Sequence, residues 1–138
     1  MSKLLEVNNL KKHFPIKGGL FRRVVGQLKA VDDVSFGIEK GQTFGLVGES
    51  GCGKSTLGRA ILRLHEPTGG QVLLDGTDIT ALDRQALTSA RRDMQIIFQD
   101  PYASLSPRRT ILQTLLEPLE THNIGSAQSR REKVEDLL

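Results

Sequence analysis

The sequence predicts an α/β fold in which an antiparallel sheet comes first and a strand–loop–helix unit follows. Three observations predict this order. Residues 3–14 alternate in polarity, a short apolar run at residues 43–48 ends in glycine, and good helix formers occupy residues 56–64. Alternation is typical of a half-buried strand, and a short apolar run is typical of a strand buried on both faces.

Composition narrows the class of protein. The 138 residues are 38% hydrophobic and 25% charged, which is typical of a soluble globular domain and excludes a disordered chain. A net charge of +3 suits a polyanionic ligand such as a nucleotide but is too small to imply nucleic acid. The single cysteine excludes an internal disulfide and fits a reducing compartment. No apolar run approaches the roughly 18 residues that span a bilayer.

Strands are predicted first. Residues 3–14 alternate well enough for a strand, and the glycine-containing stretch 18–27 predicts a loop or a hairpin tip. Residues 28–42 predict a second strand that ends in a turn at Gly41. The apolar run 43–48 then predicts a buried strand.

A helix and a hairpin are predicted next. The helix at residues 56–64 should end before Pro67, where a proline and two glycines follow. Residues 71–76 predict a strand that closes on Asp75-Gly76, a strong turn pair.

The second half predicts helices around one more buried strand. Residues 83–92 favour a helix and the apolar run 94–99 a buried strand. After a proline-containing loop, residues 111–120 begin a helix that Pro118 is expected to interrupt.

The last predicted helix lies in residues 126–138. Ser129 with Glu132 forms a capping signature there, and Ser126 is an alternative cap. Its apolar stripe starts only at Val134, close to the last residue, so we expect the chain to be the N-terminal part of a longer protein.

One motif carries the chemistry. Gly48, four intervening residues and then Gly53-Lys54-Ser55 make a full phosphate-binding loop pattern between a predicted strand and a predicted helix. Glycines allow backbone conformations in which successive N–H groups converge on an anion. The helix that starts near Lys54 directs its free N–H groups and its dipole to the same place. Lys54 adds a charge for the β and γ phosphates, and the Ser55 hydroxyl can bind Mg²⁺. Cys52 fills a variable position and is expected to be inert.

The wider sequence resembles the ATP-binding subunit of ABC transporters. The residues that carry the resemblance are LVGESGCGKSTLGRAILRLHEPTGGQVLLDG and then IIFQDPYASLSPR, and they are most similar to the oligopeptide and dipeptide importer branch. The resemblance implies a P-loop NTPase of the ABC ATPase type, with an N-terminal antiparallel β subdomain, the start of a helical subdomain and an incomplete core sheet. It implies a nucleotide-binding core at residues 1–99 and the start of the helical subdomain at residues 100–138.

The resemblance also assigns residues to ATP and Mg²⁺. Phe14, near the end of the first strand, stacks on adenine, although a core position is its alternative. Gln99 matches the Q-loop glutamine, which reaches Mg²⁺ or the attacking water. Lys54 and Gln99 are therefore the expected catalytic residues, and Ser55 and Gln99 the expected metal ligands. The expected nucleotide-binding set is Phe14, Gly48, Glu49, Ser50, Gly51, Cys52, Gly53, Lys54, Ser55 and Thr56.

Several catalytic parts of that family are not found where they should be. They are the signature LSGGQ, a hydrophobic strand ending in Asp-Glu, and a switch histidine; His13, His65 and His122 all lie in the wrong context for the last. TGGQ at residues 68–71 and VLLD at residues 72–75 mimic the first two, but both precede Gln99 and are predicted to belong to a hairpin. We therefore expect no meaningful turnover by this chain alone.

By resemblance, the function is ATP-driven uptake of peptides by an importer. The implied partners are transmembrane permease subunits, a second ATP-binding subunit and an extracytoplasmic substrate-binding protein, with no nucleic acid. The implied location is the cytoplasmic face of the inner membrane. Nickel and glutathione importers stay open, and so does a non-catalytic nucleotide-binding module. A P-loop kinase would need lid arginines such as Arg91, Arg92, Arg108 and Arg109, and the long strand-rich N-terminus disfavours it.

Overall fold

The computed structural model describes residues 3–19, 23–100 and 105–138, and the chain divides into two compact units, Met1–Leu87 and Thr88–Leu138. The division at residues 99 and 100 that the resemblance implies stays a prediction. Each unit is described by itself. No helix among the described residues is long and apolar enough to cross a bilayer.

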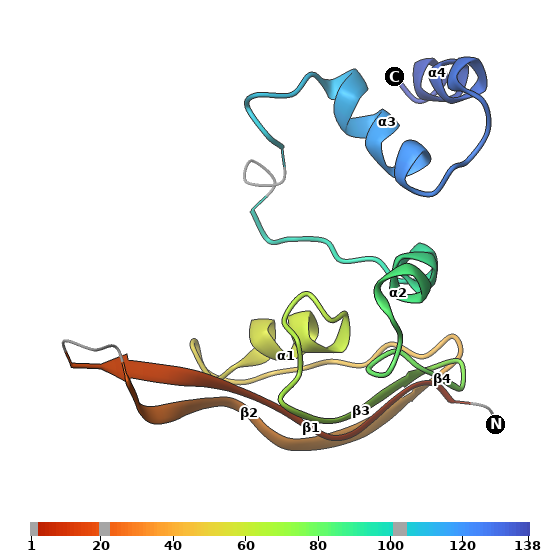
Figure 1. The fold of residues 1–138 in the computed structure, drawn as a ribbon. Coiled ribbons are helices and arrows are strands. Elements are labelled where there is room, and N and C mark those ends of the chain that lie inside the picture. The colour runs from red at the N-terminus through yellow and green to blue at the C-terminus, as the bar shows by residue number, and fades with distance from the viewer. Residues whose placement is uncertain (1–2, 20–22, 101–104) are drawn as a thin grey trace. The chain divides into compact units, whose positions relative to one another are not determined.

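The first unit is built on an antiparallel sheet (Figure 1). Its order is β2-β1-β3-β4, with β1 at Lys3–Gly18, β2 at Arg23–Glu39, β3 at Gly69–Leu74 and β4 at Thr77–Asp78. The long β1 pairs with β2 on one side and with β3 on the other. The predicted N-terminal antiparallel subdomain is therefore present, and its first two strands run through most of the stretch 18–27 that the sequence assigned to a loop or tip. Residues 20–22 of that stretch lie outside the described residues.

Helix α1, Lys54–Ile61, lies across one face of this sheet, as Figure 1 shows. Its buried residues are Leu57 and Ala60, and α1 contacts β1 and β2. The other side chains of this unit that are almost inaccessible to solvent are Val7, Leu10, Val31 and Val72 in the sheet and Ile79 directly after β4. Burial of such side chains stabilises each by about 1.5–3 kcal/mol. This packing fixes α1, and with it the loop that precedes α1, against β1 and β2.

The end of α1 differs from the prediction. The helix stops at Ile61 rather than at residue 64, because Arg63 adopts a left-handed conformation with φ of 49°. The Arg63 guanidinium donates hydrogen bonds to the carbonyls of Ile79 and Leu82, at 2.8 and 2.7 Å, and pairs with Glu66 at 2.7 Å. The two carbonyls lie 16 and 19 residues further along the chain, so the local sequence could not indicate these hydrogen bonds.

The predicted hairpin at Asp75-Gly76 is confirmed. Both residues have positive φ, 45° and 81°, and they join β3 to β4. The signature-like TGGQ does not start a helix, as predicted, because β3 begins at Gly69. Its two glycines lie in β3 itself and not in the turn of the hairpin. A Cβ on Gly70 would lie 2.3 Å from the Asn9 carbonyl oxygen, and Asn9 sits where the register between β1 and β2 shifts. Gly70 is therefore required by close backbone approach.

Two predicted strands are absent. Residues 43–48 and 94–99 have no regular secondary structure, and Val47 and Ile97 are both 91% exposed. In the described part of the chain no strand pairs with either segment. A strand exists only through its hydrogen-bonded neighbours, so apolar composition alone is not sufficient. The prediction of an incomplete core sheet holds, while the prediction of these two strands is wrong for this structure.

Helix α2 spans Arg84–Ala90 and continues into the 3₁₀ turn η1 at Arg91–Asp93, as the helical pattern at residues 83–92 predicted. The Asp83 carboxylate accepts a hydrogen bond from the Ala86 amide at 2.8 Å and caps the helix.

The second unit carries two further helices, α3 at Ile111–Thr121 and α4 at Ala127–Glu135, which contact each other. Thr110 and Gln113 form a reciprocal capping box at the start of α3. Contrary to the prediction, Pro118 does not interrupt α3, and its carbonyl accepts the His122 amide at 3.1 Å. The cap of α4 is Ser126 rather than Ser129, because Ser126 accepts the Ser129 amide at 3.2 Å.

Candidate functional site

The phosphate-binding pattern forms an irregular loop that enters α1 through a left-handed residue. Gly53 is the N-cap of α1, with φ of 99° and ψ of 2°, and Gly51 has φ of 82°. Such conformations cost a residue with a Cβ about 1–2 kcal/mol, so glycine is the natural choice at both positions. No side chain caps α1.

The missing cap leaves backbone donors at the start of α1. The first intrahelical hydrogen bond runs from the Leu57 amide to the Gly53 carbonyl at 2.8 Å. The amides of Lys54, Ser55 and Thr56 precede it, and such amides have no intrahelical partner. They point out of the helix N-terminus together with the positive end of its dipole. This arrangement suits an anion.

The Lys54 side chain folds back over the loop. Its ammonium donates to the carbonyls of Gly48 and Glu49, at 2.6 Å each, and lies 3.5 Å from the Cys52 sulfur. The side chain is half-buried, while that of Ser55 in the same first turn is exposed. A positive charge and a hydroxyl therefore lie at the same end of α1.

Space around the loop excludes side chains at two of its glycines. A Cβ on Gly53 would lie 2.2 Å from the Ala30 carbonyl oxygen of β2, and one on Gly48 would lie 2.8 Å from the Cys52 sulfur. A Cβ on Gly51 would meet nothing within 4 Å. The loop is thus held against β2 at its helical end and stays open at Gly51. The open space at Gly51 leaves room for an anion, and the residues present fit the phosphates of the predicted nucleotide.

The expected adenine-stacking residue lies in the same unit. Phe14, in β1, is half-buried and pairs across the sheet with Leu28. Its ring meets that of His65 edge-on, with centroids 5.8 Å apart, and the Lys12 ammonium lies 4.9 Å from the Phe14 centroid. The sequence indicated Phe14 but neither neighbour, because His65 follows α1 and lies fifty-one residues further along the chain.

The remaining predicted site residues are exposed. Glu49, Ser50 and Cys52 are among them, and Cys52 carries a free thiol. Gln99 is also exposed and occupies a bend at the end of residues 94–99. It belongs to the second unit, so its role toward the loop stays a prediction. Ala30, whose carbonyl limits the loop, carried no signal in the sequence.

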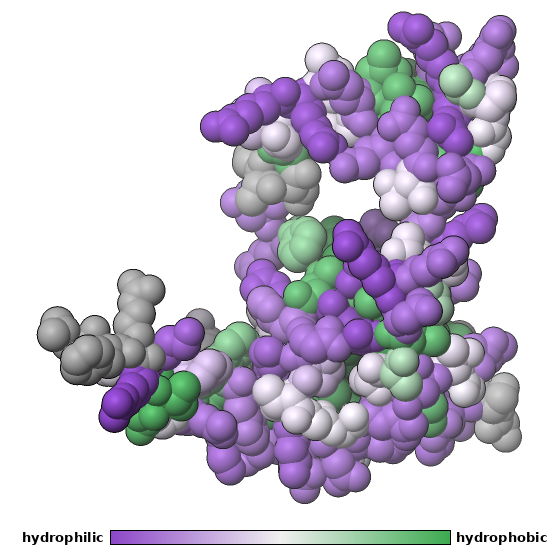
Figure 2. All heavy atoms as spheres, viewed as in Figure 1, coloured by the Kyte–Doolittle hydropathy of each residue, from purple (hydrophilic) through white to green (hydrophobic). Residues whose placement is uncertain are grey.

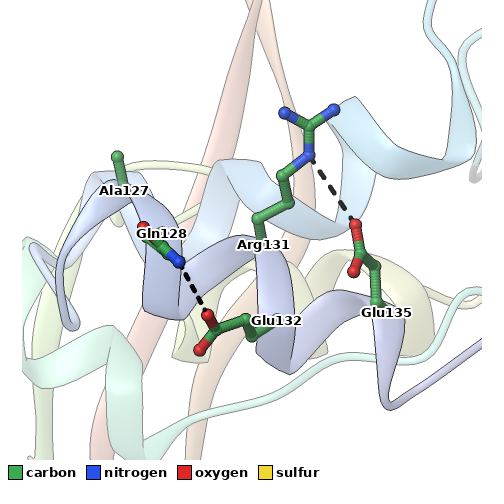
Figure 3. Close-up of a pocket in the computed structure, with 5 residues that line it drawn as sticks. All are labelled: Ala127, Gln128, Arg131, Glu132 and Glu135. Atoms are coloured by element: carbon green, nitrogen blue, oxygen red, sulfur yellow. Dashed lines mark hydrogen bonds and ion pairs between the residues drawn. The ribbon is translucent and has the colours of Figure 1, made fainter.

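Another surface feature has different chemistry. A hollow of about 450 Å³ lies along α4 and is lined by Ala127, Gln128, Arg131, Glu132 and Glu135 (Figure 3). Gln128 donates to Glu132 at 3.1 Å, and Arg131 pairs with Glu135 at 3.7 Å. Two carboxylates against one guanidinium make this hollow unsuitable for a triphosphate.

Comparison with known proteins gives consistent results. A family model described as ABC transporter matches residues 31–138. The oligopeptide transport ATP-binding protein AppF of Bacillus subtilis (strain 168) is 54% identical over 136 residues, which are 98% of this chain and 41% of AppF. The glutathione import ATP-binding protein GsiA of Pectobacterium atrosepticum is 50% identical over 135 residues, which are 98% of this chain and 22% of GsiA.

A solved structure shows the same fold. An ATP-binding cassette, determined as a dimer in a post-hydrolysis state with ADP and Pi bound, matches with a TM-score of 0.73 and 30% sequence identity. The match covers 96% of this chain and 54% of that cassette. This chain therefore spans less than half the length of the curated relatives above and about half of the cassette.

Proposed function

Since this chain belongs to the ABC transporter family, we propose that it is the N-terminal part of the ATP-binding subunit of an importer whose cargo is peptide. The proposal of peptide uptake is supported by 54% identity to a relative named for oligopeptide transport. Identity of 50% to a relative named for glutathione import supports glutathione as the alternative cargo. In the complete subunit, ATP binding and hydrolysis would drive uptake.

The entrance to α1 is the observation that carries this proposal. The amides of Lys54, Ser55 and Thr56 precede the first hydrogen bond of α1, and the Lys54 ammonium lies over the loop within 2.6 Å of two carbonyls. In the proposed complex the ammonium exchanges these neutral acceptors for phosphate oxygens. A phosphate oxygen carries negative charge and a carbonyl oxygen does not, so the exchange adds charge–charge attraction to the hydrogen bonds and favours ATP.

Two residues are proposed to hold Mg²⁺ beside the phosphates. The Ser55 hydroxyl is exposed in the first turn of α1, and an oxygen ligand there suits this cation. Gln99 would supply an amide oxygen from the second unit. When bound, Mg²⁺ neutralises phosphate charge.

Phe14 is proposed to stack on the adenine base. Its ring is half-buried, and the T-shaped contact with His65 holds the ring in place. Stacking between the Phe14 ring and the flat adenine ring would supply the attraction.

The partners and the place of action are also proposals. They are transmembrane permease subunits, a second ATP-binding subunit and an extracytoplasmic substrate-binding protein, at the cytoplasmic face of the inner membrane. Catalysis of phosphoryl transfer depends on positioning and on charge stabilisation. This chain supplies the cradle and Lys54, while the signature, the Asp-Glu strand and the switch histidine would come from the rest of the subunit. We therefore expect ATP binding without turnover by this chain alone.

Substitution of Lys54 tests the proposal. Lys54→Ala removes a charge-assisted interaction worth about 1.5–3 kcal/mol, so ATP affinity should fall about tenfold to 150-fold. Isothermal titration calorimetry with ATP and Mg²⁺ measures the change, and circular dichroism shows that the variant is folded. Lys133→Ala, an exposed lysine of α4, is the matched control and should bind ATP as the unaltered chain does. Equal affinity in the two variants would count against the nucleotide site.

A further inference from the structure

Strands β1 and β2 remain paired beyond the point where the rest of the sheet ends. The pairing of β1 with β3 goes no further than Lys11 opposite Gly69, whereas its pairing with β2 continues to Gly18 opposite Arg23. Figure 1 shows the two strands projecting past α1. Residues 15–18 and 23–28, here named the distal ribbon, therefore have no covering element among the described residues of this unit.

One face of the distal ribbon is apolar. Ile16 lies opposite Gly26, and Leu28 lies two residues from Gly26 along β2, so the two side chains share a face. Val25 joins them, because a Cβ on Gly18, two residues from Ile16, would lie 3.0 Å from a Val25 methyl group. The exposed fractions of Ile16, Val25 and Leu28 are 48%, 67% and 59%.

Two basic residues lie at this end of the ribbon: Arg23, opposite Gly18, is on the apolar face, and Lys17, opposite Val24, is on the other face. Lys17 and Arg23 are exposed, and neither pairs with an acidic group in the described part of the chain. The sequence has no aspartate or glutamate anywhere in residues 15–31. Lys29 is excluded from this set because it pairs with Asp32 at 3.0 Å. In Figure 2, hydrophobic and strongly hydrophilic surfaces lie side by side at the end of the molecule where β1 and β2 project.

We propose that the distal ribbon binds the surface of a bilayer that contains anionic lipids. Ile16, Val25 and Leu28 would enter the boundary between headgroups and acyl chains, and Lys17 and Arg23 would contact lipid phosphates. Exposed apolar side chains next to cations, with no carboxylate between residues 15 and 31, are the composition of segments that lie in the membrane interface. The long basic side chains reach the headgroups while their stems stay on apolar surface.

Charge favours this occupant over a second copy of the chain. Two distal ribbons packed face to face would bring four unpaired cations together without a carboxylate between residues 15 and 31 to offset them. Anionic headgroups are the complementary partner. The inference goes beyond the proposed nucleotide site. Leu28 lies opposite Phe14 of that site, so the variants that test the ribbon leave Leu28 unchanged and alter only residues outside the site.

Vesicle co-sedimentation of the full chain tests the proposal. Phosphatidylcholine vesicles are compared with vesicles that also contain phosphatidylglycerol. We expect binding to the mixed vesicles, weak binding to the neutral ones, and release at high salt. Lys17→Gln with Arg23→Gln should weaken binding about 25-fold, at about fivefold for each cation. Ile16→Ser with Val25→Ser should also release the chain.

A double variant of α4 and the segment after it is the matched control. Leu137 is 70% exposed and Lys133 is exposed, so Leu137→Ser with Lys133→Gln removes one apolar and one basic group outside the distal ribbon and should leave lipid binding unchanged. Circular dichroism establishes folding, and ATP calorimetry on the same samples separates this proposal from that of the nucleotide site. Equal binding to both vesicle types, or unchanged binding by the ribbon variants, would overturn the proposal. So would dimerisation that the Ile16 and Val25 substitutions abolish in the absence of lipid.

Discussion

The contact between Gly53 and Ala30 leads to the sharpest prediction about the loop. An alanine at position 53 would have to adopt φ of 99° and place its Cβ 2.2 Å from the Ala30 carbonyl oxygen. The left-handed backbone costs about 1–2 kcal/mol. Relief of the overlap requires β2 or the loop to move, which costs a further 1–3 kcal/mol at the level typical of overpacked sites. Gly53→Ala should therefore destabilise the first unit by about 2–5 kcal/mol.

Two other glycines provide controls of known geometry. Gly51 also has positive φ, but a Cβ there meets nothing within 4 Å, so Gly51→Ala should cost only the backbone part, about 1–2 kcal/mol. Gly58 lies inside α1 with equally open space, and Gly58→Ala should stabilise the unit by about 0.5–1 kcal/mol.

Urea denaturation followed by circular dichroism measures this series. In a domain of this size each kcal/mol of stability shifts the melting temperature by about 4–8 °C, so the three variants should show the same order in their melting temperatures. Calorimetry then compares ATP affinity among the variants that stay folded, where Gly53→Ala should bind more weakly than Gly51→Ala. A Gly53→Ala variant no less stable than Gly51→Ala would refute the reasoning, because the Ala30 contact would then not determine the loop position.

Two further predictions concern pH and capping. Burial alone would raise the pKa of Asp78, but hydrogen bonds from Thr80 and from Gln71, the latter at 2.7 Å, outweigh it and lower the pKa below 3.8. The stabilisation from a lowered pKa is present above 3.8 and is lost as pH falls through the folded value, so acid unfolding of Asp78→Asn should lack this component. Thr110→Ala removes the acceptor of the Gln113 amide and should cost α3 about 1 kcal/mol, visible as lost helicity that Thr110→Ser restores.

The loop and its helix could be predicted from sequence because their determinants are local. Gly53 at the entrance, Lys54 after it and helix formers behind them act on neighbours within a few residues of the chain. The Asp75-Gly76 hairpin was predictable for the same reason, since a two-residue turn depends on its own φ values. The resemblance of the wider sequence added Phe14 and Gln99, which no spacing rule would have indicated.

The predictions that were wrong concern features that depend on residues distant in the chain. Residues 43–48 and 94–99 are apolar enough for strands, but a strand needs a partner, and the described structure provides none. The early end of α1 at Ile61 depends on Arg63 reaching the carbonyls of Ile79 and Leu82. The helix through Pro118 shows that one lost amide near a helix end is tolerated when the following turn keeps its bonds.

The sequence by itself therefore determined the parts of the proposed site: a glycine loop, a lysine and a helix N-terminus in the order of the phosphate-binding pattern. Tertiary structure alone decided which glycine is irreplaceable, through the Ala30 carbonyl at Gly53, and that β1 and β2 stay paired beyond the end of β3. The physical reason is that both features depend on contacts between strands. The loop is limited by a backbone approach between Gly53 and Ala30, which are more than twenty positions apart, and the ribbon depends on the register of β1 and β2. No local pattern of residues encodes such contacts.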